Sequence, residues 1–362
     1  MQTAIPYMQF RGGSSKGLFF KATDLPADEA SRNKIILAAT EGVGQGDLRQ
    51  IDGLGGGTSL TSKVAIVSLS KDKDADIDYL FLQVVIGKGK MSTMQTCGNI
   101  LAGVVPFAVE CGIIKANNPT TSARVNMVNT GGICEVTIQT PGGKVNYAGD
   151  AKVDGVPGTA APIICNYLGT AGSNCGTLLP TGNVKDIVDG IEVTCIDNGM
   201  PEVIIRADDL GITGYEMPAE LDTNKILKNK LENIRLQIGH KMNLGDVQEK
   251  TVPKMCIISA PLNGGTINTR TFIPHVCHEA IGVLGAVSTA TACMLKGTVM
   301  DGIAIVYNKR NLSIEHPTGE FTVCLDLTKT NDHIIINQAG VIRTARLLSK
   351  GEVFVPGNIA NL

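Results

Sequence analysis

Short runs of apolar and β-branched residues, each broken by Gly, Asn or Asp, dominate the hydrophobic pattern of the chain. Such runs are typical of β-strands, and the turn signals Pro141-Gly142-Gly143 and Asn263-Gly264-Gly265 separate them. Few helical stretches lie between consecutive runs, so the pattern favours antiparallel or mixed sheets over a parallel sheet of βαβ units. The predicted strands are Ile5–Phe10, Val64–Leu69, Ile77–Ile86, Ala123–Asn129, Cys134–Gln139, Lys144–Tyr147, Ile191–Cys195, Val203–Arg206, Lys254–Ala260, Gly302–Tyr307 and Glu320–Leu325.

Four helices are predicted, and they are of two kinds. Ala27–Thr40 and Thr223–Gly239 are amphipathic, the second with Asp222 as its N-cap, so each is expected to cover a sheet on the solvent side. Gly98–Ile113 and Ala280–Met294 are apolar around almost the whole circumference and rich in Gly and Ala, which predicts burial on all sides.

One apolar helix lies in each half of the chain. This predicts an α/β (α+β) protein of two similar domains, each a curved, mainly antiparallel sheet rolled around its central helix. The turn signal Thr181-Gly182-Asn183 sets the expected boundary, which gives domains of residues 1–184 and 185–362. Whether the last strand of the chain returns to the first domain is left open.

Charge and cysteine content narrow the class of protein. The 362 residues carry 32 Lys and Arg against 34 Asp and Glu, a net charge of −2, so nucleic acid and anionic membranes are poor candidate partners. The start of the chain lacks the pattern of a signal peptide, and ten scattered cysteines then predict reduced thiols in the cytoplasm. The only local cluster of metal-ligand type, His275-Val276-Cys277-His278, is interpreted as a helix start without metal.

Glycine is abundant, with 42 residues beside 8 Phe, 6 Tyr and no Trp, so backbone conformations matter more than bulky side chains. The stretches Gly42–Gly46 and Gly53–Gly57 complete neither the dinucleotide-binding nor the P-loop pattern, and no G-x-S-x-G motif is present. Nucleotide binding and serine-hydrolase chemistry are therefore not supported.

Lys63 lies where a Gly-rich stretch, residues 50–62, enters the apolar run Val64–Val67. Removing water from a lysine ammonium favours the neutral amine, which can take a proton from a carbon acid and later return it. Lys63 is thus a candidate general base, and Gly56 belongs to the loop before it. The alternative is a lysine whose ammonium reaches the surface.

Thr96-Cys97-Gly98-Asn99 stands immediately before the first apolar helix. The unpaired N–H groups of a helix start attract carboxylates and favour a thiolate, so Gly98 and Asn99 could bind substrate and Cys97 could act as acid or base. Alternatively, Asn99 is only a cap and Cys97 a small buried residue. Cys277 near the second apolar helix has a different context, which disfavours a two-thiol racemase mechanism.

Several polar, Gly-rich turns could aim N–H groups and hydroxyls at an anion, or be plain β-turns. They are Arg11–Gly17, Asn129–Gly132, Asp197–Pro201 and Glu315–Gly319.

Ten motifs in one order, from residue 11 to residue 348, resemble the PrpF family of allylic isomerases. They are RGGSSKG, QIDGLGGGTSLTSK, TCGNILAGV, VNTGG, VDGVPGTAAP, VTCIDNGMP, NTRTFIPH, STATACM, IEHPTGE and IRTARLL. The chain is most similar to the 4-oxalomesaconate tautomerase branch, on residues 178–183, 196–201 and 252–256. One departure is that Ser14 stands where the family commonly has Thr, which keeps a hydroxyl.

The resemblance implies the diaminopimelate epimerase fold, with the active site between its two domains and with no cofactor and no metal. The reaction that it implies is the tautomerisation of 4-oxalomesaconate in the bacterial breakdown of gallate- or protocatechuate-type acids. The alternatives are isomerisation of 2-methylaconitate or 3-methylitaconate, or a non-catalytic polycarboxylate-binding protein. The assembly stays open, a homodimer included. The expected catalytic residues are Lys63, Cys97 and Ser15, and the expected substrate-binding residues are Arg11, Ser14, Gly56, Gly98, Asn99, Asn129, Thr130, Met200, Arg270, His275 and Ser288.

Overall fold

The computed structural model describes residues 1–43, 46–94, 96–308, 310–330 and 334–360. It divides into two compact units, Met1–Asn166 with Ile342–Leu362, and Tyr167–Val341. The chain therefore leaves the first unit once and returns to it with its last strand. Among the described helices, none combines the length and the apolar character needed to cross a membrane.

The division lies at residue 166, not near residue 184 as the sequence suggested. The segment after residue 166 belongs to the second unit because it is tied to the end of β10 (Ile191–Asp197). The N–H of Gly172 donates to the carbonyl of Asp197 (2.7 Å), and the Thr170 hydroxyl donates to Asn198 Oδ1 (2.6 Å).

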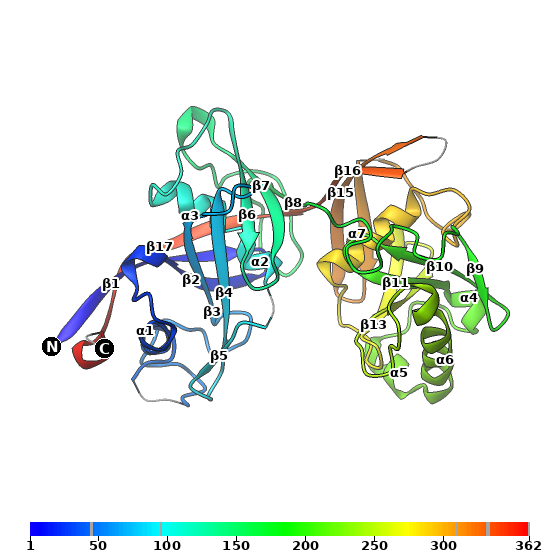
Figure 1. Cartoon of the computed structure of the whole chain (residues 1–362), viewed down its shortest axis with the longest axis horizontal. Helices are drawn as coiled ribbons and strands as arrows, with labels where there is room; N and C mark the ends of the chain where they lie inside the picture. Colours follow the sequence, from blue (N-terminus) through cyan, green and yellow to red (C-terminus); the bar gives the residue numbers. More distant parts are fainter. Residues whose placement is uncertain (44–45, 95, 309, 331–333, 361–362) are drawn as a thin grey trace. The chain divides into compact units, whose positions relative to one another are not determined.

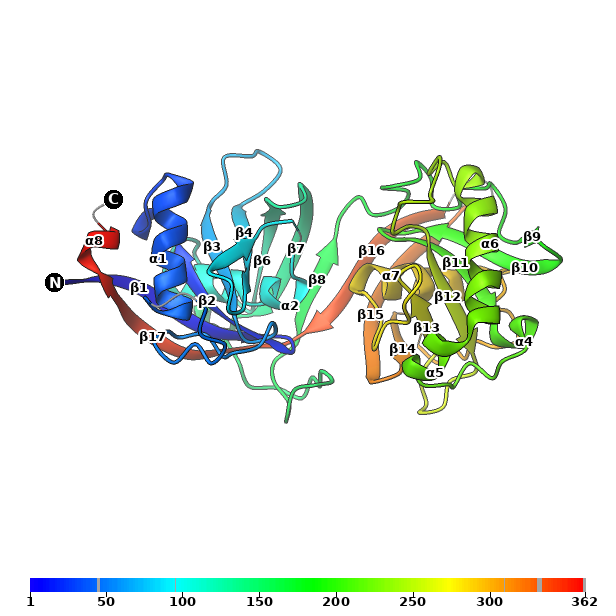
Figure 2. The same cartoon turned by 90° about the horizontal axis from the view of Figure 1, so that it is seen from below.

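The first unit is a mainly antiparallel sheet with α1 on one face and the short helices α2 and α3 on the other (Figures 1 and 2). One face packs on α1 through a core that includes Leu18, Val64 and Leu82. On the other face, Phe10 contacts Phe107 of α3 at a ring distance of 6.4 Å. The elements of this unit are β1 (Gln2–Gly12), β2 (Ser15–Lys21), η1 (Ala22–Asp24), α1 (Glu29–Glu41), β3 (Lys63–Leu69), β4 (Ile77–Val85), β5 (Lys90–Ser92), α2 (Gly98–Leu101), α3 (Val104–Glu110), β6 (Thr120–Met127), β7 (Gly132–Gln139), η2 (Pro141–Gly143), β17 (Ala345–Pro356) and α8 (Gly357–Ala360), with β8 (Ile163–Tyr167) at the division.

The second unit repeats this arrangement. Its sheet packs on α6 through Val193, Val203 and Met255, and the opposite face packs on α7, which contacts β10, β11, β14 and β15 (Figure 2). The remaining elements are β9 (Asp186–Val188), β11 (Pro201–Arg206), α4 (Ala207–Leu210), α5 (Pro218–Thr223), α6 (Lys225–Lys241), β12 (Lys254–Ser259), β13 (Ile267–Phe272), α7 (Val283–Cys293), β14 (Asn311–His316), β15 (Gly319–Lys329) and β16 (Ile334–Arg343), the last ending at the division. The expected fold class, two similar units each with a sheet around a central helix, is confirmed.

Several predicted elements are corrected. Gly98–Ile113 is not one helix but α2 and α3, because Pro106 lacks the N–H that would bond to the carbonyl of Ala102. The N-cap of α6 is Asn224, whose side chain accepts from the N–H of Leu227 (3.0 Å), and not Asp222.

Two predicted strands are absent from the described chain. Residues 144–147 follow a turn in which Gly142 and Gly143 have positive φ, and they pair with no strand. Residues 302–307 continue a turn in which the N–H groups of Ile303 and Ala304 both donate to the carbonyl of Met300 (3.0 Å each). An apolar run of this length does not by itself specify a strand, because a strand also needs a neighbouring strand to pair with.

Candidate active site

Lys63 is the first residue of β3, and its side chain is 7% exposed. Val64 and Ile66 pack toward α1, so alternation turns Lys63 to the face that packs on α2 and α3. Its Nζ donates to Gln83 Oε1 (2.5 Å), the residue opposite it on β4, and lies 5.3 Å from the centre of the Phe81 ring. The sequence suggested that Lys63 is partly removed from water, and the residue is indeed buried.

A polar cluster surrounds the start of α2 on the same face. Asn99 Nδ2 donates to the hydroxyl oxygens of Ser14 (3.1 Å) and Ser15 (3.4 Å). At Gly12 a Cβ atom would lie 2.3 Å from the carbonyl oxygen of Asn99, so only glycine lets this turn approach the helix start.

The cluster and Lys63 are joined through β2. Gly17 is the register partner of Lys63, and a Cβ atom on it would lie 2.6 Å from the Lys63 carbonyl oxygen and 3.2 Å from Ile100. Ser15 is two residues before Gly17 in the same strand and therefore points to the same face. The fold thus gathers Lys63, Ser15 and Asn99 in one unit.

Cys97 is the partly exposed N-cap residue of α2. Its carbonyl accepts from the Tyr79 hydroxyl (3.2 Å) and from the N–H of Leu101 (2.9 Å), while its thiol makes no cap hydrogen bond. The backbone at Cys97 is therefore fixed, and Gly98 follows it as the first helical residue. The thiol is thus partly exposed at a fixed point of the backbone.

Three further candidates of this unit, Asn129, Thr130 and Gly56, lie in turns and loops near Lys63 or its neighbours in the sheet. The Asn129 side chain binds the N–H and the carbonyl of Phe81 (2.8 and 2.9 Å), so it fixes the strand that carries the ring near Lys63. Thr130 is exposed in the next turn, and the N–H of Gly56 donates to Ser62 Oγ (3.3 Å) in the loop before Lys63.

Arg11 lies on the other face of the sheet from Lys63, because its neighbours Phe10 and Gly12 face α3 and α2. Its guanidinium donates to the carbonyls of Gly13 (2.9 Å) and Thr344 (3.0 Å). Burial, followed by the charge of Arg346, lowers the pKa of Arg11. The structure therefore separates Arg11 from the predicted site.

In the second unit, Ser288 and Met200 come together. Ser288 is fully buried in α7, and its hydroxyl donates to the carbonyl of Met200 (2.7 Å) and accepts from the N–H of Asn198 (3.0 Å). The Asn198 side chain adds a hydrogen bond to Thr291 (2.8 Å). Ser288 therefore holds the turn that carries Met200 and presents no free hydroxyl.

Glu202 lies on the face of the second sheet that packs on α7, and it is fully buried. Oε2 accepts from the Thr289 hydroxyl (2.8 Å), and Oε1 has no hydrogen-bond partner among the described residues. Burial, opposed by the Thr289 hydrogen bond and by Lys254, raises the pKa of Glu202 to about 8. The carboxyl group is thus mostly protonated at neutral pH.

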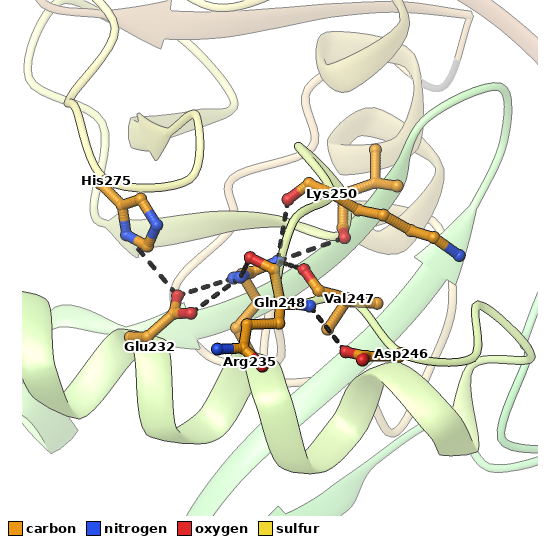
Figure 3. A network of polar contacts seen from close by, with 8 residues as sticks. Glu232, Arg235, Asp246, Val247, Gln248, Lys250 and His275 are labelled. Atoms are coloured by element: carbon orange, nitrogen blue, oxygen red, sulfur yellow. Dashed lines mark hydrogen bonds and ion pairs between the residues drawn. The ribbon is translucent and has the colours of Figure 1, made fainter.

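Arg270 and His275 lie apart from this turn. The Arg270 guanidinium donates to the carbonyls of Glu216 (2.7 Å) and Thr269 (2.8 Å). His275 Nδ1 is 3.6 Å from a carboxylate oxygen of Glu232, which also binds the fully buried Arg235 (Figure 3). Both candidates are thus engaged in contacts within the second unit.

Sequence reasoning missed Gln83, Phe81 and Glu202. Alternation along β4 does put Tyr79, Phe81 and Gln83 on one face, which marks Gln83 as the polar end of an aromatic stripe. Only the register with β3 reveals that Gln83 is opposite Lys63.

The chain is similar to known proteins over nearly its whole length. A family model described as PrpF protein matches residues 2–356. The chain is 52% identical to a 4-oxalomesaconate tautomerase of Pseudomonas putida, over 98% of this chain and 97% of the relative, and 52% identical to a (4E)-oxalomesaconate Delta-isomerase of a Novosphingobium species, over 97% of each. The crystal structure of a methylitaconate-delta-isomerase superposes with a TM-score of 0.87 at 32% identity, covering 99% of this chain and 97% of that one.

Proposed function

The chain belongs to the PrpF family, and we propose that it is a cytoplasmic, cofactor-independent isomerase that moves a proton across the allylic system of 4-oxalomesaconate. The observation that carries this proposal is the buried Lys63 beside the Ser15 and Asn99 cluster. The two relatives named for oxalomesaconate support the choice of substrate, and the reaction fits the breakdown of gallate- or protocatechuate-type aromatic acids.

Lys63 acts as the base. In its neutral form the amine takes the allylic proton, which the neighbouring carbonyl of the substrate makes acidic. The electron pair of the broken C–H bond enters the conjugated system and gives a dienolate, and the amine becomes an ammonium. Gln83 fixes Nζ at the end of its strand, so the base is oriented before substrate arrives.

Cys97 returns a proton to the far end of the dienolate, which forms the new C–H bond, and the proton on Lys63 then restores the thiol. A thiol at the start of α2 is suited to this step because it is partly exposed while its backbone is held by Tyr79. The two groups together move one proton across the allylic system with no net change in the enzyme.

The substrate carboxylates and the developing enolate need donors arranged in advance. The Ser14 and Ser15 hydroxyls, the Asn99 amide and the N–H of Gly98 supply them from one turn and one helix start. Local dipoles of this kind suit an anionic substrate on a protein with a net charge of only −2.

Two measurements test the proposal. 4-Oxalomesaconate, 2-methylaconitate and 3-methylitaconate are assayed side by side, and 4-oxalomesaconate is expected to have the highest kcat/KM. Exchange of the allylic hydrogen in deuterated water is followed by NMR. A polycarboxylate-binding protein without catalysis would bind all three acids and give no exchange, and that result would refute the proposal.

A further inference from the structure

Three cations stand side by side across three strands of the first unit. In the antiparallel pair of β1 and β2, Arg11 is directly opposite Lys16, and in the pair of β1 and β17 it is directly opposite Arg346. Directly opposite residues of an antiparallel pair point to the same face of the sheet. Lys16, Arg11 and Arg346 therefore form one row, which we call the cationic row.

The row lies on the face away from Lys63. Leu18, two residues after Lys16, belongs to the core under α1, and Gln9, two residues before Arg11, donates to the carbonyl of Leu54 (3.4 Å), which packs against the same core. Lys63 points to the opposite face. The cationic row is thus distinct from the proposed active site.

No carboxylate of the described residues forms an ion pair with the row. Within the described part of the chain, none of the three side chains takes part in an ion pair. The same unit shows the usual arrangement at Arg124, which is directly opposite Glu135 on β7. Like charges directly opposite one another destabilise a sheet, so the row costs free energy unless an anion binds to it.

The centre of the row is held in place. The Arg11 Nη1 atom donates to the carbonyl and to the hydroxyl of Thr344, at 3.0 Å each, and Thr344 lies two residues before Arg346 on the same face. Arg346 is exposed and Lys16 is partly exposed, so both can reach a ligand in solvent. A fixed guanidinium flanked by two cations that reach solvent is a suitable receptor for an oxyanion.

We propose that Lys16, Arg11 and Arg346 form a second anion site, for a small oxyanion that carries two or more negative charges. Carboxylate and phosphate oxygens accept from guanidinium groups with the same geometry, so a polycarboxylate or inorganic phosphate would fit.

The test is isothermal titration calorimetry of the full chain at low ionic strength with two probes, citrate and inorganic phosphate. Saturable binding is expected with at least one probe, and Arg346→Gln and Lys16→Gln should each weaken it about tenfold or more. Arg124→Gln is the matched control and should leave binding unchanged. Binding of citrate alone assigns the site to polycarboxylates, and binding of phosphate alone assigns it to phosphate.

Thermal unfolding supplies a second readout. Arg346→Glu converts the like-charge pair into an opposite-charge pair, so its Tm without ligand should exceed that of the wild type, and the binding probe should raise the Tm of the wild type but not of the variant. The proposal is overturned if neither probe gives saturable binding, or if Arg346→Gln binds as the wild type does. It is also overturned if Lys63→Ala alone abolishes the binding, since the anion then occupies the active site.

Discussion

The two units share one architecture but use the polar residues of the inner sheet face, the face packed on α2 and α3 or on α7, in different ways. In the first unit, Lys63 stands at the first residue of β3 and keeps 7% exposure. In the second unit, Glu202 on this sheet face and Ser288 on α7, which packs against it, are fully buried, and their hydrogen bonds stay inside the core. The polar group at a strand end is the one to which we assign chemistry, whereas the enclosed groups make hydrogen bonds within the core.

The largest effect is expected at Lys63. Lys63→Ala should lower kcat by at least about 10³-fold while the far-ultraviolet circular dichroism stays unchanged, because the base for the first proton transfer is lost. Lys21→Ala is the matched control, since Lys21 is a lysine of the same unit whose Nζ donates to the carbonyl of Cys111 (3.5 Å). Turnover near that of the wild type in Lys63→Ala would show that Lys63 is not the general base.

Cys97 separates the two proton transfers. Cys97→Ala should lower isomerisation about 100-fold but leave deuterium exchange at the allylic carbon close to that of the wild type, because Lys63 still removes the proton. Cys111→Ala is the control, as the other partly exposed thiol of the unit. Equal losses of exchange and isomerisation would contradict a separate acid.

The next prediction concerns Glu202, the buried carboxyl group of the second unit. Its pKa is about 8 in the folded protein against the ordinary value of 4.5, so between these pH values the folded state holds a proton that the unfolded state releases. Stability therefore falls as the pH rises through this window, and Glu202→Gln should flatten the profile.

The measurement is urea unfolding from pH 5 to pH 9. Lys254 and Cys256 face Glu202 from β12. Burial lowers the pKa of Lys254, which makes stability rise with pH, the opposite of the Glu202 effect. Burial raises the pKa of the Cys256 thiol, which makes stability fall only near the ordinary thiol value of 9.0, so the slopes are compared below about pH 8. Glu249→Gln is the control, at an exposed glutamate. A Glu202→Gln profile with the slope of the wild type would show that another group titrates.

The smallest effect is expected at Ser288. Ser288→Ala leaves the N–H of Asn198 and the carbonyl of Met200 without a partner, which should cost about 1 kcal/mol of unfolding free energy. The kcat should change by less than about threefold, because the hydroxyl only holds the turn. Ser173→Ala, at an exposed serine of the same unit, is the control. A large loss of kcat with unchanged stability would make Ser288 a substrate contact.

The sequence predicted the inner and outer helices because their periodicity is local. Glu29–Glu41 and Lys225–Lys241 cover the outer faces, and α7 is enclosed as its apolar circumference indicated. The strand at residues 302–307 failed because an apolar run does not say whether a neighbour will pair with it. Pro106 was present in the sequence as the signal that the first apolar helix breaks.

The motifs also determined the family and the choice of Lys63, since Gly-rich turns and a lysine at a strand start are properties of consecutive residues. Tertiary structure alone decided that Gln83 is opposite Lys63, that Ser288 has no free hydroxyl, and that Arg11 stands between two other cations on the far face. The physical reason is register. Which residues of distant strands lie opposite one another depends on the packing of the whole sheet, and shifting one strand by a single residue would turn each side chain to the other face.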